Sequence, residues 1–180
     1  MLLFAILPDS WQSMLRYTRS AIENGAYWRL FSGHLLHSNG WHLLMNLAGL
    51  LLAMLLHGRY FSPATLTMHW MAGALMISVA LYLFSPAISV YVGLSGLLHC
   101  MLTTGAVYDI RQRQRGGALL LVALIGKVVW EQWQGPDAAL AELINANVAI
   151  DAHLYGVLSG LCIALGYAVA TRLKRHTPHN

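Results

Sequence analysis

Charged side chains are scarce in this chain of 180 residues, because Asp, Glu, Lys and Arg make up only 10% of it while hydrophobic residues make up 57%. A soluble domain carries about 25% charged residues, so the composition excludes an ordinary soluble fold. The chain also lacks Pro/Gly/Ser-rich linkers, low-complexity tracts and internal repeats. With a mean hydropathy of +0.55, we expect an all-α integral membrane protein with a single domain over residues 1–180.

The chain has only two cysteines, Cys100 and Cys162. Their spacing is not that of a metal site. Both lie in hydrophobic segments, and we expect small, buried apolar side chains. There is no H-E-x-x-H motif and no dense His/Asp cluster. His34 and His37 with His42 are the set that could hold a metal, but we expect neither metal nor cofactor. Basic residues form no patch interleaved with aromatics, so we expect no nucleic-acid partner.

Long apolar runs predict the membrane-spanning segments. A spanning helix needs roughly 20 residues, and five runs approach or reach this length, at 41–57, 64–84, 93–109, 117–134 and 148–171. A sixth run at about 1–8 is too short to span alone and lacks the basic start and cleavage site of a signal peptide. We interpret it as part of a truncated first helix of a six-helix bundle; a short interfacial anchor is the alternative.

The distribution of basic residues predicts the orientation, because Lys and Arg concentrate in cytoplasmic loops. Seven basic residues follow the second, fourth and sixth segments, namely Arg59, Arg111, Arg113, Arg115, Arg172, Lys174 and Arg175. The opposite side holds three, all in the first loop, namely Arg16, Arg19 and Arg29. The link between segments five and six is acidic. We therefore expect a multi-pass protein with both termini in the cytoplasm.

Polar residues gather at the outer ends of three segments. His42 and Asn46 lie in the first turns of segment two, and Ser95 opens segment four. His153 lies about five residues into segment six, roughly 7 Å deep at a rise of 1.5 Å per residue. Polar side chains in lipid are costly and usually functional. Their common depth predicts a reactive site at the outer face.

Ser95 is the candidate nucleophile. Most serines in membrane helices only bond a backbone carbonyl, so one serine alone is a weak signal. Here Gly93 and Gly96 flank it at a helix start, where the chain can turn sharply and free N–H groups can stabilise an oxyanion. Leu97 stands where the G-x-S-x-G motif of soluble hydrolases needs glycine.

His153 is the candidate general base, because a neutral imidazole can accept the serine proton and return it to the leaving amine. Gly156 and Gly160 lie on the same helix face and allow close approach to another helix. This face could serve packing alone, but we expect it to dock on segment four and bring His153 to Ser95. Asp151 points elsewhere on the helix, so we expect a Ser-His dyad without a carboxylate.

His42 and Asn46 are four residues apart and share one helix face. The first interpretation is that they join two helices through hydrogen bonds. The second is that both donate hydrogen bonds to the oxyanion of a tetrahedral intermediate, together with the backbone near Gly93.

Taken together, these residues resemble the rhomboid family of intramembrane serine proteases. The shared features are Trp28-Arg29, His37, His42 with Asn46, Gly93-Leu94-Ser95-Gly96, and Ala152-His153 with Gly156 and Gly160. The resemblance implies a six-helix rhomboid bundle with Ser95 as nucleophile and His153 as base. It also implies an oxyanion site of His42, Asn46 and the Ser95 backbone, and a first loop with Trp28-Arg29 lying partly in the membrane.

Two positions depart from the family pattern. His99 stands where many rhomboids have a tyrosine, and Gly33 replaces a loop histidine. The histidine and the short chain look more like the rhombosortase subfamily. That resemblance implies a bacterial inner-membrane enzyme, with its site towards the outer face, that cuts membrane-anchored proteins ending in Gly-Gly, a hydrophobic helix and a basic tail. His99 could orient His153 or only pack with Ser95. A broad-specificity rhomboid is the runner-up, followed by an inactive membrane-protein binder and a small transporter.

Lys127 and Glu131 are four residues apart on one face of the fifth segment. Because charges exposed to lipid are costly, the first interpretation is a neutralising pair at a helix interface. In rhomboids the fifth helix borders the side entrance for substrates, so the second interpretation is recognition of a polar feature near the cleavage site.

Overall fold

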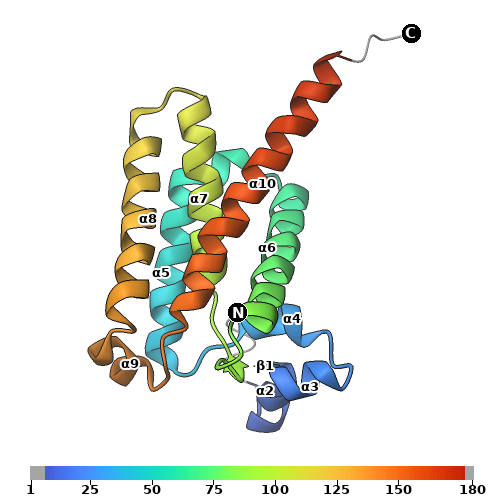
Figure 1. Cartoon of the computed structure of the whole chain (residues 1–180), viewed down its shortest axis with the longest axis vertical. Coiled ribbons are helices and arrows are strands. Elements are labelled where there is room, and N and C mark those ends of the chain that lie inside the picture. Colours follow the sequence, from blue (N-terminus) through green and yellow to red (C-terminus); the bar gives the residue numbers. More distant parts are fainter. Residues whose placement is uncertain (1–6, 177–180) are drawn as a thin grey trace.

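Five long helices form the body of the protein in a computed structural model that describes residues 7–176 (Figure 1). They are α5 (Gly40–His57), α6 (Pro63–Phe84), α7 (Ser95–Arg111), α8 (Arg115–Gln134) and α10 (Ile150–His176). Their bounds coincide with those of the five long apolar runs to within a few residues, except at the end of α10. Pro63 at the first position of α6 and the Ser62 side chain, which accepts from the Thr65 N–H, show how local sequence starts a helix.

Four of these helical segments are long and apolar enough to cross a membrane, at Gly40–Tyr60, Pro63–Phe84, Arg115–Gln134 and Ile150–Val169. Large apolar side chains on them face outwards; Leu55 and Leu119, for example, are 75% and 74% exposed. Such a surface suits lipid, so the chain is a multi-pass membrane protein. The first predicted segment at 1–8 lies mostly outside the described residues, and Leu7 and Pro8 are not helical. A count of six spanning helices is therefore not reached in the part that the structure describes.

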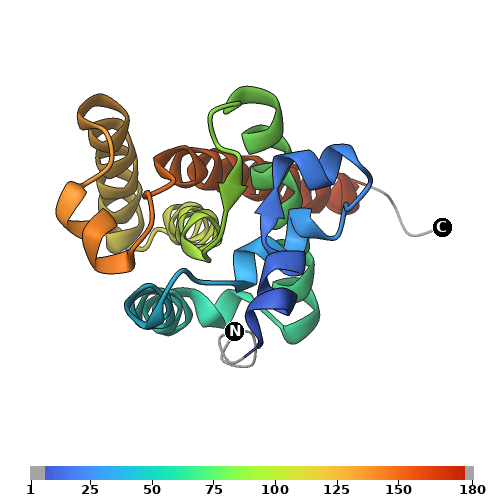
Figure 2. The same ribbon diagram turned by 90° about the horizontal axis from the view of Figure 1, so that it is seen from below.

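Helix α7 lies at the centre of the bundle, with α5, α6, α8 and α10 packed against it (Figure 2). It is the most enclosed of the five; the run from Gly96 to Met101 is buried throughout. Its closest neighbour is α10, where small residues let the two backbones meet. A Cβ at Gly156 would overlap the carbonyl oxygen of Gly96, and one at Gly160 would come within 2.5 Å of the carbonyl oxygen of Cys100. The glycines of α10 thus set the distance between the two helices.

Gly156→Val is expected to destabilise the protein by about 1–3 kcal/mol, because the new side chain forces α10 away from α7. Thermal unfolding in detergent measures the change. Gly166→Ala on the same helix is the control, since no atom lies within 4 Å of an added Cβ there. Equal unfolding temperatures for the two variants would contradict the close contact of α7 with α10.

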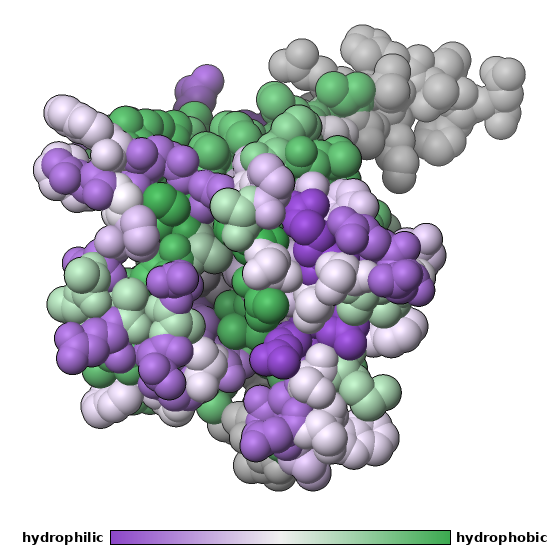
Figure 3. All heavy atoms as spheres, turned by 60° about the horizontal axis from the view of Figure 1, so that its bottom comes forward, coloured by the Kyte–Doolittle hydropathy of each residue, from purple (hydrophilic) through white to green (hydrophobic). Residues whose placement is uncertain are grey.

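Short elements cover one end of the bundle. They comprise α2 (Asp9–Leu15), α3 (Arg19–Glu23), α4 (Arg29–Ser32), the 3-10 turn η1 (Gly33–Leu35) and α9 (Ala138–Ile144). Strands β1 (Tyr17–Thr18) and β2 (Val90–Tyr91) pair antiparallel there, and the turn η2 (Gly58–Tyr60) follows α5. Hydrophilic side chains gather on this end of the molecule (Figure 3). None of these elements was expected from the apolar runs.

Trp28 and Arg29 organise the first loop. The Trp28 indole N–H donates to the carbonyl oxygen of Met14, and the Arg29 guanidinium donates to those of Ser13 and Arg16. Arg19 binds the loop to the bundle, because its guanidinium donates to three carbonyl oxygens at the end of α6: those of Leu81, Tyr82 and Ser85. A cation at a helix C-terminus satisfies carbonyls that lack helical partners.

His34 fixes η1 to α6. Its Nε2–H donates to the Ser78 hydroxyl oxygen at 2.9 Å, and that hydroxyl in turn donates to the carbonyl oxygen of Leu30. His34 is 1% exposed, and burial lowers its pKa from the ordinary 6.5 to about 4. It therefore faces α6 instead of joining His37 and His42 in a metal site.

The stability of the protein is expected to fall as the pH drops from about 6.5 towards 4, because the unfolded chain protonates His34 while the folded chain resists protonation. The fall of the His34 pKa from 6.5 to about 4 corresponds to a contribution of roughly 3 kcal/mol to the free energy of unfolding. This contribution is complete above pH 6.5 and is lost as the pH falls towards 4. Unfolding temperatures at about pH 7.5 and pH 4.5 measure the loss. His34→Gln, which keeps a donor but does not titrate, should reduce the difference. His37, whose pKa burial also lowers to about 4, supplies a remainder.

Cys100 is buried, as expected, but Cys162 is exposed, so the prediction that both are buried is wrong for Cys162. In the sequence the two look alike because both lie in apolar helices. Cys162 lies on the outward face of α10, where lipid replaces protein as the apolar surroundings.

Candidate active site

Ser95 and His153 are in contact at the end of the bundle that carries the short elements. The Ser95 hydroxyl oxygen lies 3.0 Å from His153 Nε2. Ser95 is the first residue of α7, and His153 is in the first turn of α10. Gly93 lies two residues before Ser95 and has a φ of +125°, which only glycine adopts without strain. A hydroxyl and an imidazole at this distance can pass a proton between them.

His42 and Asn46 converge on Gly93 from α5. A Cβ at Gly93 would lie 2.7 Å from His42 Nε2 and 3.8 Å from Asn46 Nδ2. Both side chains are buried, and Asn46 Nδ2 has no hydrogen-bond partner among the described residues. An unpartnered buried donor is costly, so its presence next to Ser95 calls for an acceptor that arrives from outside.

The loop before α5 holds the His42 ring. The Ser38 backbone N–H lies 3.4 Å from His42 Nδ1, and the Ser38 hydroxyl oxygen lies 3.0 Å from the same nitrogen. That hydroxyl donates to the carbonyl oxygen of Ile144 at the end of α9. His42 is thereby oriented with its Nε2 towards Gly93.

His99 makes both of the contacts considered for it. Its ring stacks on that of His153, with centroids 4.4 Å apart and planes 17° from parallel. Its Nδ1–H donates to the carbonyl oxygen of Ser95 at 2.8 Å. His99 therefore packs beside both members of the Ser95–His153 contact.

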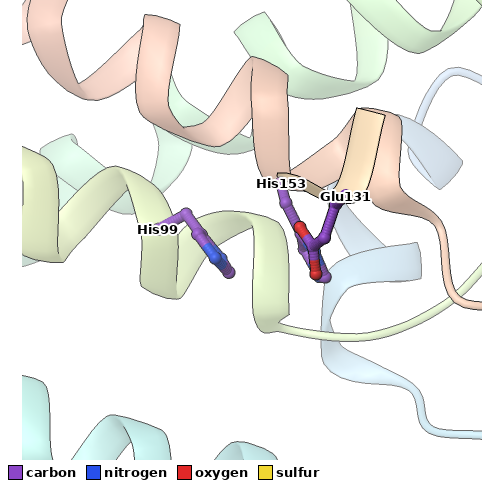
Figure 4. Close-up of side chains that lie close together, drawn as sticks. All are labelled: His99, Glu131 and His153. Atoms are coloured by element: carbon purple, nitrogen blue, oxygen red, sulfur yellow. The ribbon is translucent and has the colours of Figure 1, made fainter. Parts of the chain in front are cut away.

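Glu131 also contacts His153, so the expectation that no carboxylate accompanies this histidine is wrong. Glu131 on α8 lies 2.9 Å from His153 Nδ1 through Oε2 and accepts from Lys127 through Oε1. Figure 4 shows the Glu131 carboxylate turned towards the His153 ring. Asp151 does point elsewhere, as predicted, since it accepts from the Ser85 hydroxyl at 2.6 Å.

The chain carried one signal for Glu131. It lies three residues before the end of α8, and His153 lies three residues after the start of α10. Two helices joined at one end of a bundle bring such positions to the same depth. The i,i+4 pair with Lys127 already gives the carboxylate a partner, so the spacing within α8 does not indicate the contact with His153.

His99, Glu131 and His153 place ligand atoms within 4.8 Å of one another. A metal must lie in the plane of each imidazole that binds it, because the nitrogen lone pair lies in that plane. The stacked rings of His99 and His153 direct their lone pairs side by side, so one ion cannot meet both. The geometry favours ring stacking and proton transfer over metal binding.

A groove of about 470 Å³ lies next to this site. Residues 87–92, which include β2, form one wall, residues 146–151 before α10 form another, and His42 lines it as well. The groove gives an extended segment of polypeptide room between two backbone segments close to Ser95.

Comparison with known proteins identifies the family. The model of the Rhomboid domain family matches residues 24–169, which include every element of the site. The chain belongs to the rhomboid family. This rhomboid is similar to YdcA of Bacillus subtilis (strain 168), described as a candidate rhomboid protease, with 22% identity over 157 residues, 86% of this chain and 74% of YdcA. Members of the family are intramembrane serine proteases, which agrees with the serine and histidine side chains placed among membrane helices.

Proposed function

We propose that this rhomboid is an intramembrane serine endopeptidase in which Ser95 is the nucleophile and His153 the general base. The observation that carries the proposal is the 3.0 Å contact of Ser95 Oγ with His153 Nε2 at the end of a bundle of apolar helices. Both side chains lie in elements that the packing of α7 against α10 holds together.

In the first step the Ser95 oxygen attacks the carbonyl carbon of the scissile peptide bond while His153 Nε2 takes the hydroxyl proton. The carbonyl oxygen becomes negatively charged and accepts hydrogen bonds from Asn46 Nδ2–H, His42 Nε2–H and the backbone N–H at the start of α7. The carbon–nitrogen bond then breaks, and His153 returns the proton to the leaving amine. Water, activated by His153, hydrolyses the acyl-enzyme and frees Ser95.

The proposed substrate is a transmembrane or carboxy-terminal sorting helix of an exported protein. A helical segment hides its peptide bonds, so part of it must unwind before it can lie in the groove beside Ser95. The distribution of basic residues favours a site on the outer side of a bacterial inner membrane, with both termini in the cytoplasm. His99 supports a rhombosortase-like preference for Gly-Gly, a hydrophobic helix and a basic tail.

Cleavage in liposomes tests this proposal. Wild type and Ser95→Ala receive two reporters, one with Gly-Gly, a hydrophobic helix and a basic tail, and one with a generic transmembrane helix that rhomboids cleave. Mass spectrometry locates the cut. We expect serine-dependent cleavage of the first reporter alone. Cleavage of both would indicate a broad-specificity rhomboid, and cleavage of neither by folded protein would overturn the enzymatic proposal in favour of a binding role.

A further inference from the structure

The two oxygens of the Glu131 carboxylate have different partners. Oε2 lies 2.9 Å from His153 Nδ1, and Oε1 accepts from Lys127 Nζ at 2.5 Å. The chain of contacts therefore runs from Lys127 through Glu131 and His153 to Ser95. We propose that Glu131 is a positioning residue that fixes the tautomer and orientation of His153, and that Lys127 holds Glu131 in place. This inference rests on the proposed function of Ser95 and His153.

The hydrogen bond from His153 to Glu131 determines which ring nitrogen can act as a base. An ionised carboxylate only accepts hydrogen bonds, so His153 Nδ1 carries the hydrogen that it donates to Oε2. A neutral imidazole has one N–H, and therefore Nε2 keeps its lone pair. That lone pair faces the Ser95 hydroxyl at 3.0 Å. Without Glu131 the ring could adopt the other tautomer, which cannot take the serine proton.

The carboxylate also limits rotation of the ring. His99 stacks on one face of His153 and resists tilting, but a ring turned by 180° about its Cβ–Cγ bond would stack equally well. The hydrogen bond to Glu131 removes this freedom by anchoring Nδ1. Once the proton arrives on His153, the negative carboxylate stabilises the imidazolium.

The burial of the pair argues against a purely structural ion pair. The Lys127 side chain is 48% exposed, whereas the Glu131 side chain is 17% exposed and that of His153 is 8% exposed. A pair that only neutralised two charges at a helix surface would not need its carboxylate to reach inwards to a histidine on another helix. Lys127 offsets the cost of a carboxylate at this depth and leaves Oε2 for His153.

Cleavage kinetics test the assignment, with Gln134→Ala as the control because Gln134 is an exposed residue at the end of α8. For Glu131→Gln we expect kcat to fall by about 10²–10⁴-fold with little change in KM, because only proton transfer is affected. Glu131→Asp should recover at least about tenfold of that loss. Gln134→Ala should leave kcat within about twofold of wild type. Lys127→Met should cause a smaller loss, of less than about tenfold, because Glu131 remains beside His153 but has lost one of its two partners.

The pH–rate profile separates positioning from structural support. His153 contacts His99 from α7 and Glu131 from α8, and Lys127 is paired with Glu131. His42 from α5 is the other titratable side chain that interacts with it. Removing the one negative charge of this set makes protonation of His153 harder, so the acidic limb of the profile should move to lower pH in Glu131→Gln. A variant that only lowers the amount of folded enzyme would reduce the rate without moving the limb.

Nitrogen NMR of histidine-labelled protein tests the inference without turnover. We expect His153 to carry its hydrogen on Nδ1 in the wild type and to show mixed tautomers in Glu131→Gln. If Glu131→Gln fails to fold, Lys127→Met/Glu131→Gln preserves charge balance and takes its place. An unchanged tautomer, or kcat within about threefold of wild type, would overturn the role of Glu131. A wild type that shows the Nδ1–H tautomer but cleaves no reporter would overturn the proposed function instead.

Discussion

Ser95→Ala and His153→Ala are each expected to lower the cleavage rate by at least about 10⁴-fold while the protein remains folded. In the proposed mechanism the first variant lacks the attacking oxygen, and the second lacks the base that accepts its proton. The two losses should not add in the double variant, because either residue alone leaves the other without a partner. Initial rates on the reporter in liposomes, with the amount of folded enzyme measured by gel filtration, give the comparison.

Ser159→Ala is the matched control for this experiment. Ser159 is also a buried serine, 3% exposed, but lies further along α10 than His153. Its substitution should leave the rate within about twofold of wild type. The assignment of Ser95 and His153 would be wrong if either variant kept more than about a tenth of the activity, because a different nucleophile or base would then carry the reaction.

The five long helices could be predicted because their signal is local. A helix of about 20 apolar residues must be buried either in a lipid bilayer or in a large protein core. The scarcity of charged residues in this chain favours the bilayer. The start of α7 followed from Ser95 with its glycines. The proximity of Ser95 and His153 was also predictable, since both begin helices at the same end of the bundle.

The short elements of the first loop could not be predicted in the same way. Their order depends on side chains that bind distant carbonyl oxygens, such as Arg19 with Tyr82 and Arg29 with Ser13. An arginine in a loop indicates membrane orientation, and nothing in the residues around it identifies its acceptor. Helices of four to seven residues also have no apolar period long enough to recognise.

The contact of Glu131 with His153 could not be predicted for a related reason. Lys127 gives Glu131 a partner within one helix, so the i,i+4 pattern by itself does not indicate a second contact. A carboxylate has two oxygens, however, and the free one meets His153 only after α8 and α10 pack together. Contacts between helices depend on their rotation, which a pattern of apolar residues leaves undetermined.

Asn46→Ala is expected to lower kcat by about 10²–10³-fold, because we propose Asn46 Nδ2–H as a donor to the oxyanion. The structure leaves this nitrogen buried and without a partner among the described residues, next to Gly93. The variant removes an unsatisfied group, so the free protein should lose little stability, or gain some, while it loses rate. Asn46→Asp keeps the shape but replaces the donor with an acceptor, and should be at least as slow.

Thr103→Val distinguishes a prepared donor from an ordinary buried polar atom. Thr103 Oγ1 is likewise buried without a partner in the described part of the chain, but it lies two turns beyond Ser95 in α7. Its substitution should leave kcat within about twofold of wild type.

Gly93→Ala tests the geometry of the site, because the added Cβ would lie 2.7 Å from His42 Nε2 at a φ of +125°. It should lower kcat as Asn46→Ala does, whereas Gly40→Ala, with open space around its Cβ, should not. Full activity in Gly93→Ala would show that the oxyanion binds elsewhere.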